Sequence, residues 1–141
     1  MRSIICLAAQ GVIRNVEDNH ISVFNIMEGI TAEGFPLFIP KFSFFALLER
    51  AMSEDDRVIG RFRATLNGND IHEQDVHINF QGQSRNRVIF TLMGLVLSQP
   101  GTLSLSLTLP TGFTASYVIE ANAVSGAQSE ATPSPQPQAN T

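Results

Sequence analysis

Strict alternation of apolar and hydroxyl side chains marks the clearest segment of the chain, which reads Thr-Leu-Ser-Leu-Ser-Leu-Thr-Leu over residues 102–109. In an extended backbone the leucines all fall on one face, whereas a helix would scatter them around its circumference. The alternation therefore predicts a half-buried β-strand with its hydroxyl groups in solvent.

Two shorter segments, residues 61–66 and 75–80, alternate in the same way. Three longer stretches, residues 20–31, 40–50 and 88–97, are apolar on both faces, which is typical of strands nearer the middle of a sheet. Periodicity alone would also allow a buried helix in each of the three. Their β-branched and aromatic residues favour strands.

Turn-forming residues separate these segments at intervals of roughly 10–13 residues. Asn67-Gly68 is a strong hairpin signal, because both residues tolerate the positive φ that a tight turn demands. Counting the segments between turns gives about eight strands. We therefore predict an all-β domain over residues 1–124, an antiparallel β-sandwich of the jelly-roll or immunoglobulin-like type.

The character of the chain changes after residue 124. Residues 125–141 contain no large apolar side chain, and Pro133, Pro135 and Pro137 alternate with other residues. Such a segment buries too little to offset the entropy lost on ordering. We predict a disordered tail rich in Pro, Ser and Gln.

Charge and hydropathy argue against several classes of function. The net charge of −4 lacks the basic footprint of a general nucleic-acid binder. The apolar run at residues 4–9 is shorter than the roughly 7–15 residues of a signal-peptide core, so we interpret it as a first strand. No segment approaches the roughly 20 apolar residues of a membrane helix. We expect a cytoplasmic protein that binds neither nucleic acid nor membrane.

Aromatic and sulfur-containing residues point to a packed core. The chain has ten phenylalanines, one tyrosine and no tryptophan, whereas sugar-binding platforms favour tryptophan and tyrosine. The single cysteine, Cys6, lies in an apolar run and cannot form an internal disulfide. We expect Cys6 to be buried and unreactive.

Candidate chemistry is sparse. His77 shares a strand face with Asp75, which would suit a general base or a ligand contact, but a solvated polar stripe has the same pattern. The spacing of histidine and cysteine fits no zinc site, and no nucleophile elbow or phosphate-binding glycine loop occurs in the sequence. We therefore expect no enzymatic activity, no metal and no cofactor.

Four arginines form the most distinctive constellation. Arg61 and Arg63 project from one face of one strand, and Arg85 and Arg87 from one face of another. If the two strands are neighbours, these guanidinium groups form a patch for an anion or an acidic partner. Alternatively, the arginines pair with carboxylates across the strands or protect a sheet edge from aggregation.

Three segments, taken in order, resemble a known family. The first is Ile5 to Ala9, which is followed by a polar turn and residues 20–30. The second is Phe35-Pro36, which is followed by an apolar strand. The third is Gln99-Pro100-Gly101, which leads into a strand. Together they are similar to the DUF6941 family of small bacterial proteins, for which no function is established. The chain departs from the family pattern at Leu103, where the family has an aromatic residue nearby. The resemblance covers most of residues 3–123, implies a β-sandwich and supplies no catalytic residue.

Two hypotheses of function follow from these patterns. The first is a non-enzymatic protein-interaction or structural module that binds a protein partner, or itself, through a sheet face or edge. The second is a sandwich that binds a small ligand or glycan in a groove lined by His77, Tyr117 and arginine side chains. A flat apolar patch would favour the first hypothesis and a deep pocket the second.

Overall fold

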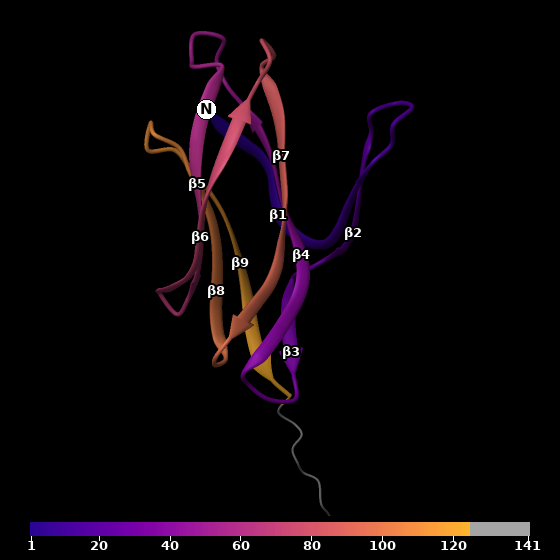
Figure 1. Cartoon of the computed structure of the whole chain (residues 1–141), viewed down its shortest axis with the longest axis vertical. Coiled ribbons are helices and arrows are strands. Elements are labelled where there is room, and N and C mark those ends of the chain that lie inside the picture. Colours follow the sequence, from indigo (N-terminus) through magenta and orange to yellow (C-terminus); the bar gives the residue numbers. More distant parts are fainter. Residues whose placement is uncertain (125–141) are drawn as a thin grey trace, which may run out of the picture.

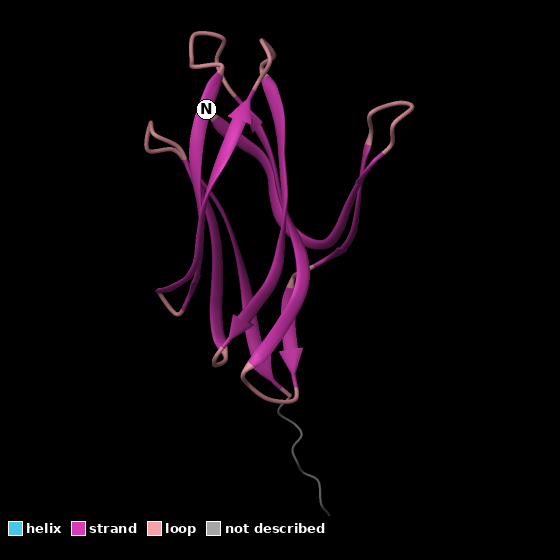
Figure 2. Ribbon diagram, viewed as in Figure 1, coloured by secondary structure: helices cyan, strands magenta, loops and turns pink. Residues whose placement is uncertain are grey.

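The computed structural model describes residues 1–124, and within them the chain consists of strands joined by turns (Figure 2). The tail predicted for residues 125–141 lies outside the described residues. The strands within residues 1–124 are β1 (Arg2–Arg14), β2 (Ile21–Ile26), β3 (Gly29–Ala32), β4 (Leu37–Glu49), β5 (Arg57–Leu66), β6 (Asn69–Asn79), β7 (Arg85–Leu97), β8 (Gly101–Thr108) and β9 (Thr114–Ala123).

These strands form two sheets that pack against each other, which confirms the predicted all-β sandwich. The first sheet, sheet A, has the order β2-β1-β4-β7, and the second, sheet B, has the order β3-β9-β8-β5-β6. All pairings are antiparallel except that of β3 with β9, which is parallel. The described residues contain no helix of the length and apolarity that a membrane span requires.

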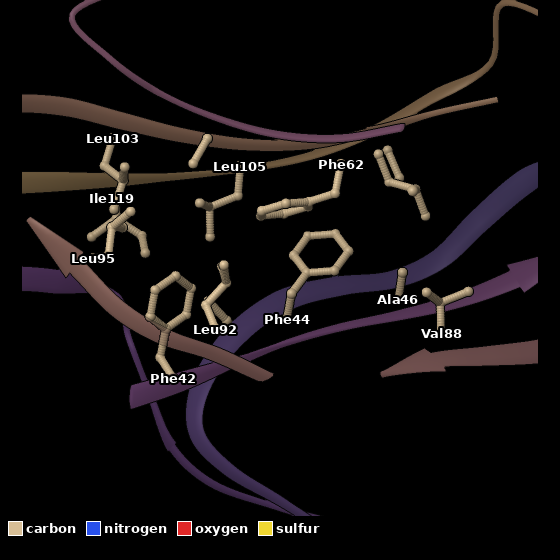
Figure 3. Packing of buried hydrophobic residues seen from close by; sticks show 14 of the residues in the cluster. Phe42, Phe44, Ala46, Phe62, Val88, Leu92, Leu95, Leu103, Leu105 and Ile119 are labelled. Carbon is tan, nitrogen blue, oxygen red and sulfur yellow. The ribbon is translucent and has the colours of Figure 1, made fainter. Parts of the chain in front are cut away.

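The predicted alternation decides which side chains fill the space between the sheets. The strand face with Leu103, Leu105 and Leu107 is fully buried, and on β5 Phe62 and Ala64 are buried in the same way. Aromatic rings join the two layers, as Figure 3 shows for Phe44 of sheet A and Phe62 of sheet B. The centroids of these two rings lie 5.2 Å apart, a separation at which aromatic pairs attract beyond simple burial.

The segment 20–31 is not the single central strand that its apolar residues predicted. β2 ends at Ile26, and the chain passes through Met27 and Glu28 into β3 of the other sheet. Asn25, one residue before the end of β2, has a φ of 52°. β2 and β3 are therefore two short strands, each at the edge of a different sheet. Apolar side chains at an edge have a neighbouring strand on one side, so Phe24 and Ile26 stay about half exposed.

The outer half of β1 and the whole of β2 form a hairpin that we call the wing, residues 10–26. β1 pairs with β4 as far as Ala9, and beyond that residue it pairs with β2 alone. Figure 1 shows the wing diverging from the two sheets as a separate arm. None of its side chains is fully buried, so the wing is held mainly by main-chain pairing.

Candidate functional site

The two predicted pairs of arginines lie in different sheets. Arg61 and Arg63 belong to β5 of sheet B, whereas Arg85 and Arg87 belong to β7 of sheet A. The condition for a four-arginine patch, that the two strands be neighbours, is therefore not met. Of the two alternatives, the single patch of four arginines is therefore not formed, because strand order is set by long-range pairing that local alternation does not encode.

Arg61 and Arg63 are engaged by carboxylates of the neighbouring strand β6. Arg61 donates hydrogen bonds to Asp75 Oδ1 at 2.6 Å and to Glu73 Oε1 at 2.8 Å, and Arg63 donates to Glu73 Oε2 at 2.6 Å. These bonds raise the pKa of both guanidinium groups and lower the pKa of Glu73 to about 2. The alternative of cross-strand ion pairs is thus confirmed here, and both arginines already have anionic partners.

The residues predicted for a ligand groove do not converge. Asp75 accepts its hydrogen bond from Arg61, and His77 lies beside Ile59 and Arg57 at a separate hollow of about 570 Å³. Tyr117 pairs with the buried Leu105, so it faces the other side of sheet B, where its hydroxyl donates to the Met27 carbonyl at 3.0 Å. Within residues 1–124, no group of three His, Cys, Asp or Glu side chains is placed to hold a metal ion.

Arg85 and Arg87 line a different feature, an open groove between the wing and the outer face of sheet A. We call it the arginine groove; its volume is about 770 Å³. Its polar lining consists of Arg14, Asn19, Gln81, Arg85, Asn86 and Arg87. Its apolar lining consists of Val12 and Ile21 from the wing and Leu47 and Ile89 from the sheet.

The base of the wing covers part of this outer face. Ala9 and Phe45 are buried, yet they are not members of the apolar cluster between the two sheets. Ser43 is also buried, and its hydroxyl bonds to the Thr91 hydroxyl at 3.1 Å. Buried side chains on the outer face of sheet A therefore continue as far as the base of the wing.

The groove carries unbalanced positive charge. Arg85 pairs with Glu49 at 2.9 Å, and Glu49 is shared with Arg2, so hydrogen bonds from both arginines lower the pKa of its carboxyl. Arg87 donates to the amide oxygen of Asn19 at 3.3 Å, which ties the wing to β7. Neither Arg14 nor Arg87 forms an ion pair within residues 1–124.

Sequence reasoning identified Arg85 and Arg87 but missed the wing's contribution, Arg14 and Asn19. The polar turn at residues 15–19 predicts a hairpin connection. Nothing in its pattern predicts that this hairpin bends back over the outer face of sheet A. In both strands an arginine lies two residues from an apolar side chain, Arg14 from Val12 and Arg87 from Ile89, so each pair shares a strand face. Given the topology, this spacing is the signal that would have found the groove.

The free edge of sheet A is a second surface of interest. β7 ends the order of its sheet and pairs with β4 alone. Residues 88–93 of this edge read Val-Ile-Phe-Thr-Leu-Met and contain no charge, proline or glycine. Three exposed apolar side chains lie at this end of the sheet, Met93 in the segment, Val96 beyond it and Phe38 opposite Val96 on β4, and we call them the edge patch; Met93 is 72% exposed.

The other sheet edges are protected by features that β7 lacks. β2 and β3 are short, with bounds Ile21–Ile26 and Gly29–Ala32. β6 carries alternating charged or ionisable side chains, among them Glu73 and Asp75. Short length and charge are the usual means by which proteins prevent edge-to-edge pairing. Along residues 88–93, β7 has neither.

Comparisons with known proteins add no family to this picture. No protein-family model matches the chain, and a search of curated proteins found no match. The resemblance to the DUF6941 family stays a prediction.

Proposed function

We propose that this chain is a non-enzymatic protein-interaction module that receives an extended strand of a protein partner at the free edge of β7. The observation that carries the proposal is the uncharged segment 88–93 at an otherwise unpaired sheet edge. An added strand satisfies the outward main-chain groups, which is the physical basis of recognition by strand addition.

The edge patch defines the side chains that suit such a partner. Met93 and Val96 alternate with core-facing leucines, and Phe38 lies opposite Val96 on β4. A strand beside β7 brings every second side chain onto this outer face. The partner strand is therefore expected to carry apolar residues at alternate positions.

Charge favours a different protein over a second copy of this chain. β7 contains Arg85 and Arg87 but no aspartate or glutamate. Antiparallel pairing of β7 with itself would leave Arg87 opposite an uncharged or a like-charged residue, whereas a different protein can supply a carboxylate. Asp75 accepts a hydrogen bond from Arg61, so it does not orient His77 as the acid–histidine pair considered from the sequence would require.

The test compares two double variants in affinity purification from the native host. Met93→Lys with Val96→Lys places two charges on the edge patch. Ile59→Lys with Val118→Lys places two charges at comparably exposed positions on the interior strands of sheet B. All four positions are about half exposed or more, so we expect both proteins to fold.

We expect a partner that the wild type and the sheet B variant capture and that the edge variant loses. With purified partner, amide hydrogen exchange should slow along residues 88–93. Capture by the edge variant at wild-type levels, or protection confined to another strand, would overturn the proposal. Recovery of the chain alone, as a dimer that the edge variant dissociates, would replace the partner by a second copy and overturn the choice of occupant.

A further inference from the structure

We propose that the arginine groove binds an extended peptide segment in which an acidic side chain lies beside apolar side chains. The site combines wing residues with the outer face of sheet A, so it does not depend on strand addition at β7. Its ligand is defined by three properties of the lining, which are its charge, its apolar surface and its amide groups.

Charge requires an anionic group in the ligand. Three guanidinium groups line the groove, and none of its described lining residues is an aspartate or glutamate. Glu49, which does not line the groove, forms an ion pair with Arg85. Arg14 and Arg87 have no carboxylate partner within residues 1–124. Like charges around one groove repel each other, and a carboxylate offsets that repulsion with charge-assisted hydrogen bonds from the planar guanidinium groups.

The apolar lining requires more than an anion. Val12 and Ile21 face the groove from the wing, and Leu47 and Ile89 face it from the sheet. A free inorganic anion would leave these four side chains exposed to water. A ligand with an aliphatic side chain next to its carboxylate would bury them. The ligand therefore has apolar groups on the same segment as its charge.

Shape and hydrogen-bonding groups favour a peptide. The volume of about 770 Å³ is of the size of known ligand sites, but the groove is open to solvent. An open groove admits a chain that continues at both ends. Asn19, Gln81 and Asn86 supply amide donors and acceptors at its rim, which match the main-chain groups of an extended segment.

The test selects ligands from a random peptide library displayed on phage, using the purified full chain. The competing bait is the double variant Arg14→Gln with Arg87→Gln, which removes the two guanidinium groups that lack ion pairs. The matched control is Arg57→Gln, an exposed arginine outside the groove that also forms no ion pair within residues 1–124. Circular dichroism and thermal unfolding verify that each variant is folded.

We expect the selected peptides to carry Asp or Glu next to apolar residues, and to be absent from selections on the double variant. For one such synthetic peptide, fluorescence anisotropy should show about a tenfold loss of affinity with Arg87→Gln and no change beyond about twofold with Arg57→Gln. Replacing its acid by the amide should cost a similar factor.

Three results with peptides would overturn the inference. They are selection of peptides without an acid, an equal loss of affinity with Arg57→Gln, and no enrichment over the double variant. Binding of single-stranded DNA that competes with the peptide at equal concentration would also overturn it, because the groove would then recognise phosphate rather than an acidic peptide. Both proposals place a carboxylate near Arg87, and the edge variant separates them. Met93 and Val96 do not line the groove, so Met93→Lys with Val96→Lys should leave the selected peptide bound while it removes the β7 partner.

Discussion

One buried arginine connects two turns at one end of the sandwich. Arg50 is 6% exposed and donates hydrogen bonds to the Gln83 carbonyl at 2.9 Å, the Glu54 carbonyl at 2.6 Å and Asp56 Oδ1 at 3.0 Å. Its guanidinium also lies 5.2 Å from the centre of the Phe80 ring. A single side chain thus joins the β4–β5 turn to the β6–β7 turn, and so joins sheet A to sheet B.

Substitutions of Arg50 test how much these contacts contribute to the free energy of unfolding. We expect Arg50→Ala to lower the free energy of unfolding by about 2–4 kcal/mol, because two carbonyl groups and a carboxylate lose their donor in a partly dry site. Arg50→Lys should recover less than half of the loss, since one ammonium cannot reach three separate acceptors. Denaturation by urea measures both values.

The exposed Arg57 supplies the control for that measurement. Arg57→Ala changes the same charge at a surface position and should cost no more than about 0.5 kcal/mol. An Arg50→Ala variant as stable as Arg57→Ala would contradict the role assigned to Arg50. Arg50 was not singled out from the sequence, because its burial depends on the β6–β7 turn, which supplies the Gln83 carbonyl from 33 residues away.

Side-chain hydrogen bonds connect the β5–β6 turn to the β7–β8 turn. Asn67 in the β5–β6 turn donates from Nδ2 to the Pro100 carbonyl at 3.1 Å, and its Oδ1 accepts from the Thr102 amide at 2.9 Å. Gly101 lies between these two partners with a φ of 145°, and a β-carbon there would overlap the Asn67 amide. The β7–β8 turn therefore needs glycine for conformation and for space.

A double-mutant cycle separates those two requirements. We expect Gly101→Ala to cost about 2–4 kcal/mol, from the unfavourable φ and from displacement of the Asn67 side chain. In the Asn67→Gly background the overlap is gone, so the same substitution should cost at least about 1 kcal/mol less. Glycine suits residue 67 because its φ is 51°.

Unfolding free energies of the four proteins give the coupling. An additive cycle would show that Gly101→Ala acts through backbone conformation alone, and the proposed contact between the two turns would be wrong. A comparable substitution at Gly34, which has open space around its α-carbon, provides the reference for adding one methyl group.

The elements that the sequence predicted correctly are those whose burial follows a local pattern. Leu103, Leu105 and Leu107 are all buried, as the alternation required, and Asn67-Gly68 forms the predicted hairpin turn with both φ values positive. The prediction for segment 20–31 was wrong because its apolar residues resemble a central strand, whereas the chain forms two edge strands separated by Met27 and Glu28. Local pattern reports which face is apolar but not where the strand lies in its sheet.

The candidate site was predictable only in part for the same reason. Arg85 and Arg87 were recognised as a pair on one strand face, and they do line the arginine groove. Their expected companions, Arg61 and Arg63, lie in the other sheet and are held by Glu73. Which arginines share a surface depends on the order β2-β1-β4-β7, and that order follows from packing across the whole domain.

The buried core and the wing, which forms one wall of the proposed binding groove, are different parts of the domain. The buried cluster lies between the two sheets, with Phe42, Phe44 and Phe62 among its largest members. The wing contributes no fully buried side chain, and within residues 1–124 the Arg87–Asn19 bond is its one side-chain hydrogen bond to β7. The core thus fixes one wall of the arginine groove, while the other wall is held by a hairpin with little packing of its own.

This division predicts two levels of amide protection. In native-state hydrogen exchange, the amides of residues 10–14 and 21–26 should open locally, with a free energy several kcal/mol below that of the β4, β5 and β8 amides. Few buried apolar contacts oppose the opening of the wing, whereas opening of the central strands exposes the whole core. Arg87→Gln should lower protection in the wing further without changing protection in β5 or β8.

A ligand in the arginine groove bridges the two walls, so it should raise protection of the wing amides toward that of the core. Saturation with an acidic peptide selected on the wild type is the measurement, and the amide-substituted peptide is its control. If the wing amides exchange with the free energy of global unfolding in the free protein, the wing is part of the cooperative core. In that case the groove has two rigid walls, and peptide binding cannot be coupled to ordering of the hairpin.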